Sequence, residues 1–157
     1  MTDIQPGSDA GASDPASRTE HDSRRRGCSD VEQHHSDVEL RIPADSAYLA
    51  VLRTATAGLA ARLDFTLDDI EDLRIAVDEA CAMVLPQARE NSDLTCTFDL
   101  DSAKLTVAVT AVCDEPRPPN RDGFAWTVLA ALTNEVTADV DGDRLTVTLA
   151  RGTSDPE

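Results

Sequence analysis

The sequence predicts a two-layer α+β sandwich in which helices cover one face of a sheet. Two observations support this. Stretches that alternate apolar and polar residues, which is the period of a β-strand, come as neighbouring pairs at 94–100 with 105–111 and at 136–140 with 144–149. Other stretches have the three- and four-residue apolar spacing of amphipathic helices. Runs of hairpin strands beside a group of helices are typical of this architecture.

The first elements are a strand and a helix. Residues 37–42 alternate in polarity, and Pro43 ends this strand. Asp45 or Ser46 can cap a helix that runs to about residue 63. Four leucines and one threonine of this helix have a heptad-like spacing. They are Leu49, Leu52, Thr56, Leu59 and Leu63. Such a stripe is typical of either a core or a dimer seam, and periodicity does not distinguish the two.

A second helix begins at the capping box of residues 66–69 and ends near Pro86. Its apolar stripe is Ile70, Leu73, Val77, Ala80 and Val84. On the neighbouring face, Asp72, Ala76, Glu79 and Met83 stack one turn apart. Glu79 is therefore either a surface acid on the polar side or a carboxylate that points into a cleft.

The second half of the chain contains the two hairpins and one more helix. Residues 101–104 turn between the strands of the first hairpin, and the loop 114–123 holds three prolines. We expect a helix from Phe124 to about Glu135, with Asp122 as an acid that caps it. The last hairpin turns at Asp141-Gly142-Asp143, which is a typical turn sequence.

Length and composition predict a single folded domain with a polar tail. The chain has 157 residues, enough for one core. Residues 1–36 are rich in Asp, Ser, Gly, Pro and Arg, with Ile4 and Val31 as the only large aliphatic residues. Such a segment buries too little apolar surface to offset the entropy of ordering. We expect disorder over 1–36, a domain over 37–153, and a disordered end over 154–157.

The charge of the chain excludes several partners. It carries 30 acidic and 14 basic residues, for a net charge of −16, and should repel nucleic acid and anionic membranes. We therefore expect no direct nucleic-acid or membrane binding, whereas a basic protein partner is compatible with this charge. No apolar segment follows Met1, and no stretch approaches a membrane span, so a cytoplasmic protein is expected.

The four cysteines contain no C-x-x-C pair. Cys81, Cys96 and Cys113 fall inside apolar patterns, and we expect them to be small core residues in a reducing compartment. Cys28 lies near His34-His35, but no second thiol is close in sequence, so no metal site is expected. The sequence leaves open any redox role of these cysteines.

The segment L-R-I-A-V-D-E-A-C at 73–81 resembles the first nucleotide-site motif of the GHKL ATPase superfamily, in its anti-sigma factor/serine kinase branch. The resemblance extends over about residues 38–151. It implies the Bergerat fold, with a mixed, mostly antiparallel sheet under about three helices. In this motif a Glu acts as general base, and an Asn four residues later holds Mg²⁺. Here Glu79 occupies the Glu position and Met83 the Asn position.

Two further motifs of that branch have partial matches. The D-x-G-x-G motif, whose Asp binds the adenine amino group, corresponds to Asp114, with Pro116 and Pro118 at the glycine positions. Proline fixes φ and lacks an N–H, so it cannot replace glycine there. The R-x-G-x-G-F-T lid corresponds to residues 121–127. Arg121, Gly123 and Thr127 match this lid motif, and Ala125 replaces its second glycine.

The resemblance implies an anti-sigma factor that sequesters an alternative sigma factor until a STAS-domain anti-anti-sigma protein displaces it. It also implies a homodimer and a partner-binding arginine in the first helix, here Arg53. ATP and Mg²⁺ are the cofactors of the family. The alternatives are an active serine kinase that phosphorylates its antagonist, which the retained Glu79 favours, and a GHKL-derived module with an unrelated partner. The replacements at the nucleotide motifs favour binding without catalysis.

Overall fold

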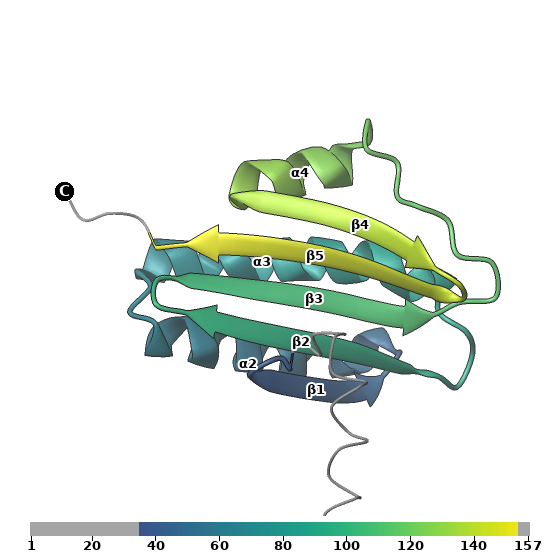
Figure 1. Cartoon of the computed structure of the whole chain (residues 1–157), viewed down its shortest axis with the longest axis horizontal. Helices are drawn as coiled ribbons and strands as arrows, with labels where there is room; N and C mark the ends of the chain where they lie inside the picture. Colours follow the sequence, from purple (N-terminus) through teal and green to yellow (C-terminus); the bar gives the residue numbers. More distant parts are fainter. Residues whose placement is uncertain (1–34, 154–157) are drawn as a thin grey trace, which may run out of the picture. The chain divides into compact units, whose positions relative to one another are not determined.

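The computed structural model describes residues 35–153. Their helices and strands all lie in one unit of the chain, 36–157, and follow the predicted order (Figure 1). The strands are β1 (Val38–Pro43), β2 (Asp93–Asp101), β3 (Lys104–Val112), β4 (Glu135–Asp141) and β5 (Arg144–Gly152). The helices are η3 (Ser46–Tyr48), α2 (Leu49–Arg62), α3 (Leu67–Val84), η4 (Leu85–Gln87) and α4 (Phe124–Leu132), with η3 and η4 being 3₁₀ turns.

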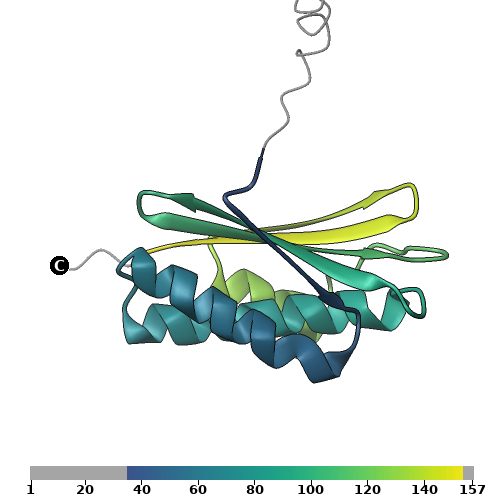
Figure 2. The same ribbon diagram turned by 90° about the horizontal axis from the view of Figure 1, so that it is seen from below.

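The sheet has five strands in the order β1-β2-β3-β5-β4. Every pairing between described strands is antiparallel, so the predicted mixed sheet has no parallel pair here. Helices α2, α3 and α4 lie together on one face of the sheet, as Figure 2 shows from below. The two-layer α+β prediction is therefore confirmed, and no helix or strand of residues 35–153 covers the other face of the sheet.

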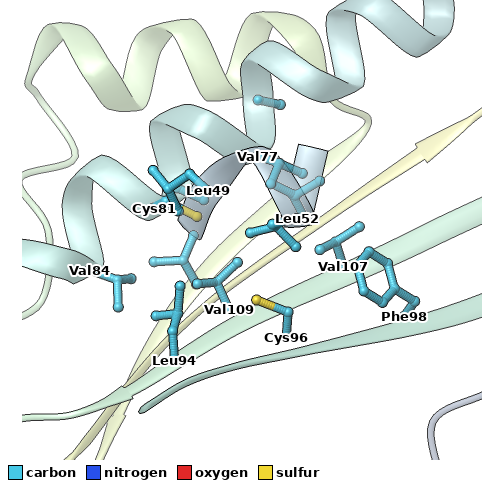
Figure 3. Close-up of a cluster of buried hydrophobic side chains, with 14 of the residues drawn as sticks. Leu49, Leu52, Val77, Cys81, Val84, Leu94, Cys96, Phe98, Val107 and Val109 are labelled. Carbon is cyan, nitrogen blue, oxygen red and sulfur yellow. The ribbon is translucent and has the colours of Figure 1, made fainter. Parts of the chain in front are cut away.

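The core lies between the sheet and the helices. Alternate residues of the strands face the helices, so Cys96 pairs with Val109, and Val109 with Val147, inside the core. Figure 3 shows part of this cluster, where side chains of α2 and α3 meet those of β2 and β3. In α2, Leu49, Leu52 and Thr56 are buried. Its apolar stripe therefore belongs to the core of its own chain.

The prediction that Cys81, Cys96 and Cys113 are small core residues is confirmed. Cys81, Cys96 and Cys113 are free thiols buried in the core. Burial raises the pKa of Cys96 to about 12 and raises the pKa of the other two thiols as well. These side chains stay neutral and pack as small apolar groups. Cys28 lies outside the described residues.

Local chemistry explains most of the helix ends. The Thr66 side chain accepts a hydrogen bond from the Asp69 amide at 3.1 Å and so caps α3, as predicted. The η4 turn, with Pro86 inside it, follows α3 directly. Gly142, at φ +63°, supplies the left-handed residue of the final hairpin turn.

Two expectations for α4 are wrong. The N-cap is Gly123 rather than Asp122, because the Gly123 amide donates to the Asn120 carbonyl at 3.1 Å and so closes a turn that keeps Asp122 one residue before the cap. The helix also ends at Leu132 and not near Glu135. The Asn134 amide already donates to the Ala150 carbonyl at 2.8 Å, so the backbone has joined the sheet before Glu135.

Candidate functional site

Helix α3 has two flanks that face different neighbours. Asp72 contacts Arg151, and Arg151 Nη1 also donates to the Leu132 carbonyl at the end of α4, so we call this side the α4 flank. Asp78 contacts Arg53 of α2, so we call the opposite side the α2 flank. Helical spacing places Glu79 on the α4 flank, close to Asp72 in rotation about the axis. Two adjacent carboxylates, Asp78 and Glu79, therefore point to different sides of one helix.

On the α4 flank, Glu79 is half-buried and makes no hydrogen bond or ion pair with any residue of 35–153. Met83, one turn later, packs against the core. The structure thus brings Glu79 and Met83 together on the face that the spacing predicts. The catalytic role of Glu79 stays a prediction.

Asp114 follows β3 and is held in a surface ion pair. Its Oδ1 accepts a hydrogen bond from Arg89 Nε at 2.8 Å, and its side chain is 79% exposed. Arg89 Nη2 also lies 3.8 Å from an Asp143 oxygen in the β4–β5 turn. Sequence reasoning missed Arg89. Sequence spacing does not predict this contact, because Arg89 and Asp114 become neighbours only when the preceding residues, Ala88 and Cys113, form a β-bridge.

The proline-containing loop after Asp114 is tied to the end of α3 by one side chain. Gln87 of η4 donates from Nε2 to the Arg117 carbonyl at 3.1 Å and accepts from the Arg117 amide at 2.8 Å. This two-way contact fixes the backbone between Pro116 and Pro118. Neither proline can donate a hydrogen bond from its backbone nitrogen.

The residues that match the lid motif gather at the start of α4. The Arg121 guanidinium lies over the Trp126 ring, 5.2 Å from its centroid, in cation–π contact. The Thr127 hydroxyl donates to the Gly123 carbonyl at 3.1 Å, so it is used inside its own helix. Phe124 is 85% exposed. Among the described residues, no hydrogen bond or ion pair joins this group to Glu79 or to Asp114.

The α2 flank is more tightly organised. Arg53 Nε donates to both oxygens of Asp78, at 2.8 and 3.0 Å, and the two side chains are 40% and 38% exposed. Arg53 borders an open groove of about 560 Å³ between α2 and α3. The other residues lining this α2–α3 groove are Thr54, Ala57, Gly58, Ala61, Leu67, Ile70 and Arg74. Small and apolar residues therefore line this groove between Arg53 and Arg74. The sequence did not predict the contact between Arg53 and Asp78.

A buried ion cluster closes the far end of the α4 flank. Arg151 of β5 contacts Asp69 at 2.6 Å and Asp72 at 3.2 Å through Nη2. Its Nη1 donates to the Leu132 carbonyl at 2.5 Å. One side chain thus joins β5, α3 and α4. Sequence reasoning assigned Asp69 only to the helix cap and missed this cluster.

Residues 42–151 match the histidine kinase-like ATPase domain family. The chain belongs to this family. It is 38% identical over 74 residues to the serine-protein kinase RsbW of Bacillus cereus (strain ATCC 10987 / NRS 248), covering 46% of each protein. It is 33% identical over 105 residues to the anti-sigma-F factor RsbW of Mycobacterium tuberculosis (strain ATCC 25618 / H37Rv), covering 67% of this chain and 62% of that protein. The chain therefore spans about half to three-fifths of these relatives.

Membership in this family confirms the resemblance read from the motif around Glu79. Within residues 35–153, no group of three or more His, Cys, Asp or Glu side chains is placed to hold a metal ion. No helix in the same range is long and apolar enough to cross a membrane.

Proposed function

We propose that this chain is a cytoplasmic anti-sigma factor. It binds an alternative sigma factor and releases it when a STAS-domain anti-anti-sigma protein competes for an overlapping surface. The observation that carries the proposal is Arg53, which the family resemblance assigns to partner binding. It lies at the edge of the α2–α3 groove with its guanidinium already oriented by Asp78. The name of the Mycobacterium tuberculosis relative, anti-sigma-F factor, agrees with this function.

The nucleotide site, in this proposal, has lost much of its function. Mg²⁺ requires hard oxygen ligands, and the Met83 thioether is not one. Pro116, Pro118 and Ala125 replace three glycines of the family motifs, and Asp114 is engaged by Arg89. The residues present therefore do not fit a bound Mg-ATP, and we expect weak nucleotide affinity and little or no phosphoryl transfer.

The homodimer also belongs to this proposal, but through a surface other than the one the sequence suggested. Because the α2 stripe is buried in its own core, a second copy needs a different face, and the open face of the sheet is available. One row across it runs Arg41, Thr95, Thr110, Thr146 and Asp139. A two-fold axis along β3 would place Arg41 opposite Asp139 of the partner subunit, with short threonines between the sheets. Sedimentation of wild type and Arg41→Glu tests this: the variant should be monomeric.

Binding is the decisive test of the main proposal. Each alternative sigma factor of the source organism is purified and titrated against the chain by calorimetry, and the STAS-domain proteins of that organism are added as competitors. One tight sigma complex that a STAS protein dissolves supports the proposal. The absence of binding to every sigma factor would favour a module with an unrelated partner.

The kinase alternative has one observation in its favour: Glu79 is retained, half-buried, and free of a partner among residues 35–153. Its test is incubation with the same STAS proteins and labelled ATP. Phosphoserine that forms readily, and disappears in Glu79→Ala, would establish the kinase. We expect no such signal.

A further inference from the structure

The Arg53–Asp78 contact uses only one edge of the guanidinium. Both oxygens of Asp78 accept from Nε, whereas neither Nη atom of Arg53 has a partner among residues 35–153. A guanidinium has five N–H donors in a rigid plane, so fixing one edge sets the direction of the others. The Nη end is left available to a further acceptor at the rim of the α2–α3 groove.

We propose that Asp78 is a positioning residue that holds Arg53 ready to bind a carboxylate of the sigma factor. This inference rests on the proposed anti-sigma function. A free arginine side chain loses rotamer freedom when a partner binds it, and that loss opposes binding. Asp78 already restricts the Arg53 rotamers in the free protein, so less side-chain entropy is lost when the complex forms.

The geometry separates this role from two others. If Asp78 occupied the position on Arg53 that the sigma factor needs, Asp78 would compete with the sigma factor for Arg53. The removal of Asp78 would then tighten the complex. If the pair served only to hold α2 against α3, the removal of Asp78 would lower the stability of the fold and leave the affinity for the sigma factor unchanged. A half-exposed ion pair contributes little to folding, which argues against the second reading.

The same groove supplies a matched control. Arg74 also lines it and pairs with Glu71 of α3 at 3.1 Å. Its side chain is 41% exposed, close to the value for Arg53. Glu71→Ala therefore removes the same charge from the same helix, beside a comparable arginine, without releasing Arg53.

The experiment measures the Kd for the sigma factor identified by the binding screen above, by calorimetry on the full chain. Asp78→Ala should weaken binding about three- to tenfold, the effect of ordering one flexible side chain. Asp78→Asn should weaken it less, because the amide oxygen still accepts from Nε. Glu71→Ala should change the Kd less than about twofold, as expected for a rim charge.

The dependence on Arg53 decides the mechanism. In an Arg53→Ala background, measured at concentrations that quantify the weakened complex, Asp78→Ala should have no further effect. Tighter binding by Asp78→Ala, or an equal loss in both backgrounds, would overturn the positioning role and leave the anti-sigma function standing. If Arg53→Ala alone leaves the Kd unchanged, the proposed binding surface fails, and the inference fails with it.

Discussion

The two flanks of α3 are built differently. On the α2 flank, a charged pair and a continuous groove lie side by side, and Arg53 is oriented by two hydrogen bonds. By contrast, no hydrogen bond or ion pair within residues 35–153 joins Glu79 on the α4 flank, Asp114 after β3 and Thr127 in α4 to one another. Asp114 pairs with Arg89, Thr127 bonds within its helix, and Glu79 has no partner among residues 35–153.

This difference separates two requirements, catalysis and protein binding. Catalysis needs a base, a metal and a phosphate cradle in register, whereas protein binding needs a stable surface with an anchor residue. Here the α2 flank, with the proposed binding residue Arg53, is organised by hydrogen bonds, whereas the α4 flank, which carries Glu79, is held together mainly by the Arg151 cluster. The expected effects of breaking each side follow from this.

The largest effect should come from Arg151→Ala. The change removes the ion pair of Arg151 with Asp69, which is 1% exposed, and the hydrogen bond that Arg151 donates to the Leu132 carbonyl at the end of α4. Breaking a buried ion pair from one side typically costs about 3 to 5 kcal/mol of unfolding free energy. Urea denaturation of Arg151→Ala, against the exposed Arg144→Ala on the same strand, measures it. A loss under about 1 kcal/mol would show that the cluster is not structural.

Arg53→Glu should act on binding and not on folding. It places a carboxylate beside Asp78 at the groove and repels the acidic group of the sigma factor, at a cost of about 2 to 5 kcal/mol in binding free energy. Calorimetry should show a Kd raised about thirtyfold or more, while the unfolding midpoint stays near that of wild type. Arg62→Glu, an exposed change near the end of the same helix, is the control. Unchanged affinity in Arg53→Glu would remove α2 from the interface.

How far the sequence predicts this asymmetry depends on the range of the interaction. The strands, the buried cysteines and the flank that carries Glu79 follow from periods of two and 3.6 residues, which are local. The final hairpin follows from a turn that requires the positive φ of Gly142. These features are visible in the sequence because neighbours in the chain determine them.

The ion pairs are not local. Arg53 and Asp78 are 25 residues apart, and Arg151 and Asp69 are 82 apart, so each pair depends on how the helices pack on the sheet. Whether the α2 stripe faces the core or a dimer partner also depends on tertiary packing, because both arrangements have the same helical period in the sequence. At α4, the turn that the Gly123 amide closes on the Asn120 carbonyl places Asp122 before the cap, so a cap assignment based on residue type alone is wrong. Composition alone does not predict which residue of a turn becomes the N-cap.

A smaller effect should follow when the α4 flank is given back a metal ligand. We expect wild type to show no change in melting temperature with millimolar Mg-ATP, because we expect it to bind nucleotide weakly. A ligand that binds only the folded state raises the melting temperature, so this measurement detects binding. Met83→Asn supplies an amide oxygen one turn from Glu79. Binding with a Kd near the nucleotide concentration would stabilise by about 0.4 kcal/mol, a shift of about 1–2 °C.

Met83→Leu, which restores no ligand, is the control for that measurement, and Mg²⁺-free ATP separates metal from nucleotide. A clear shift in the wild-type protein would mean that the α4 flank is a working nucleotide site. The proposal that only the α2 flank has kept its function would then be wrong.

The smallest effect should come from removing residues 1–36. Their composition predicts no contribution to the core, and both flanks of α3 consist of residues from 37–153. The cut must spare Asp37, whose Oδ2 accepts a hydrogen bond from the Leu100 amide at 2.7 Å beside the start of β1. We expect the unfolding free energy to change by less than about 0.5 kcal/mol and the sigma affinity by less than twofold. Asp37→Ala in the truncated chain should lower stability by about 1 kcal/mol, the typical contribution of one hydrogen bond. A large loss from the first truncation would mean that residues 1–36 complete one of the flanks, so the comparison drawn from 37–153 alone would not describe the whole protein.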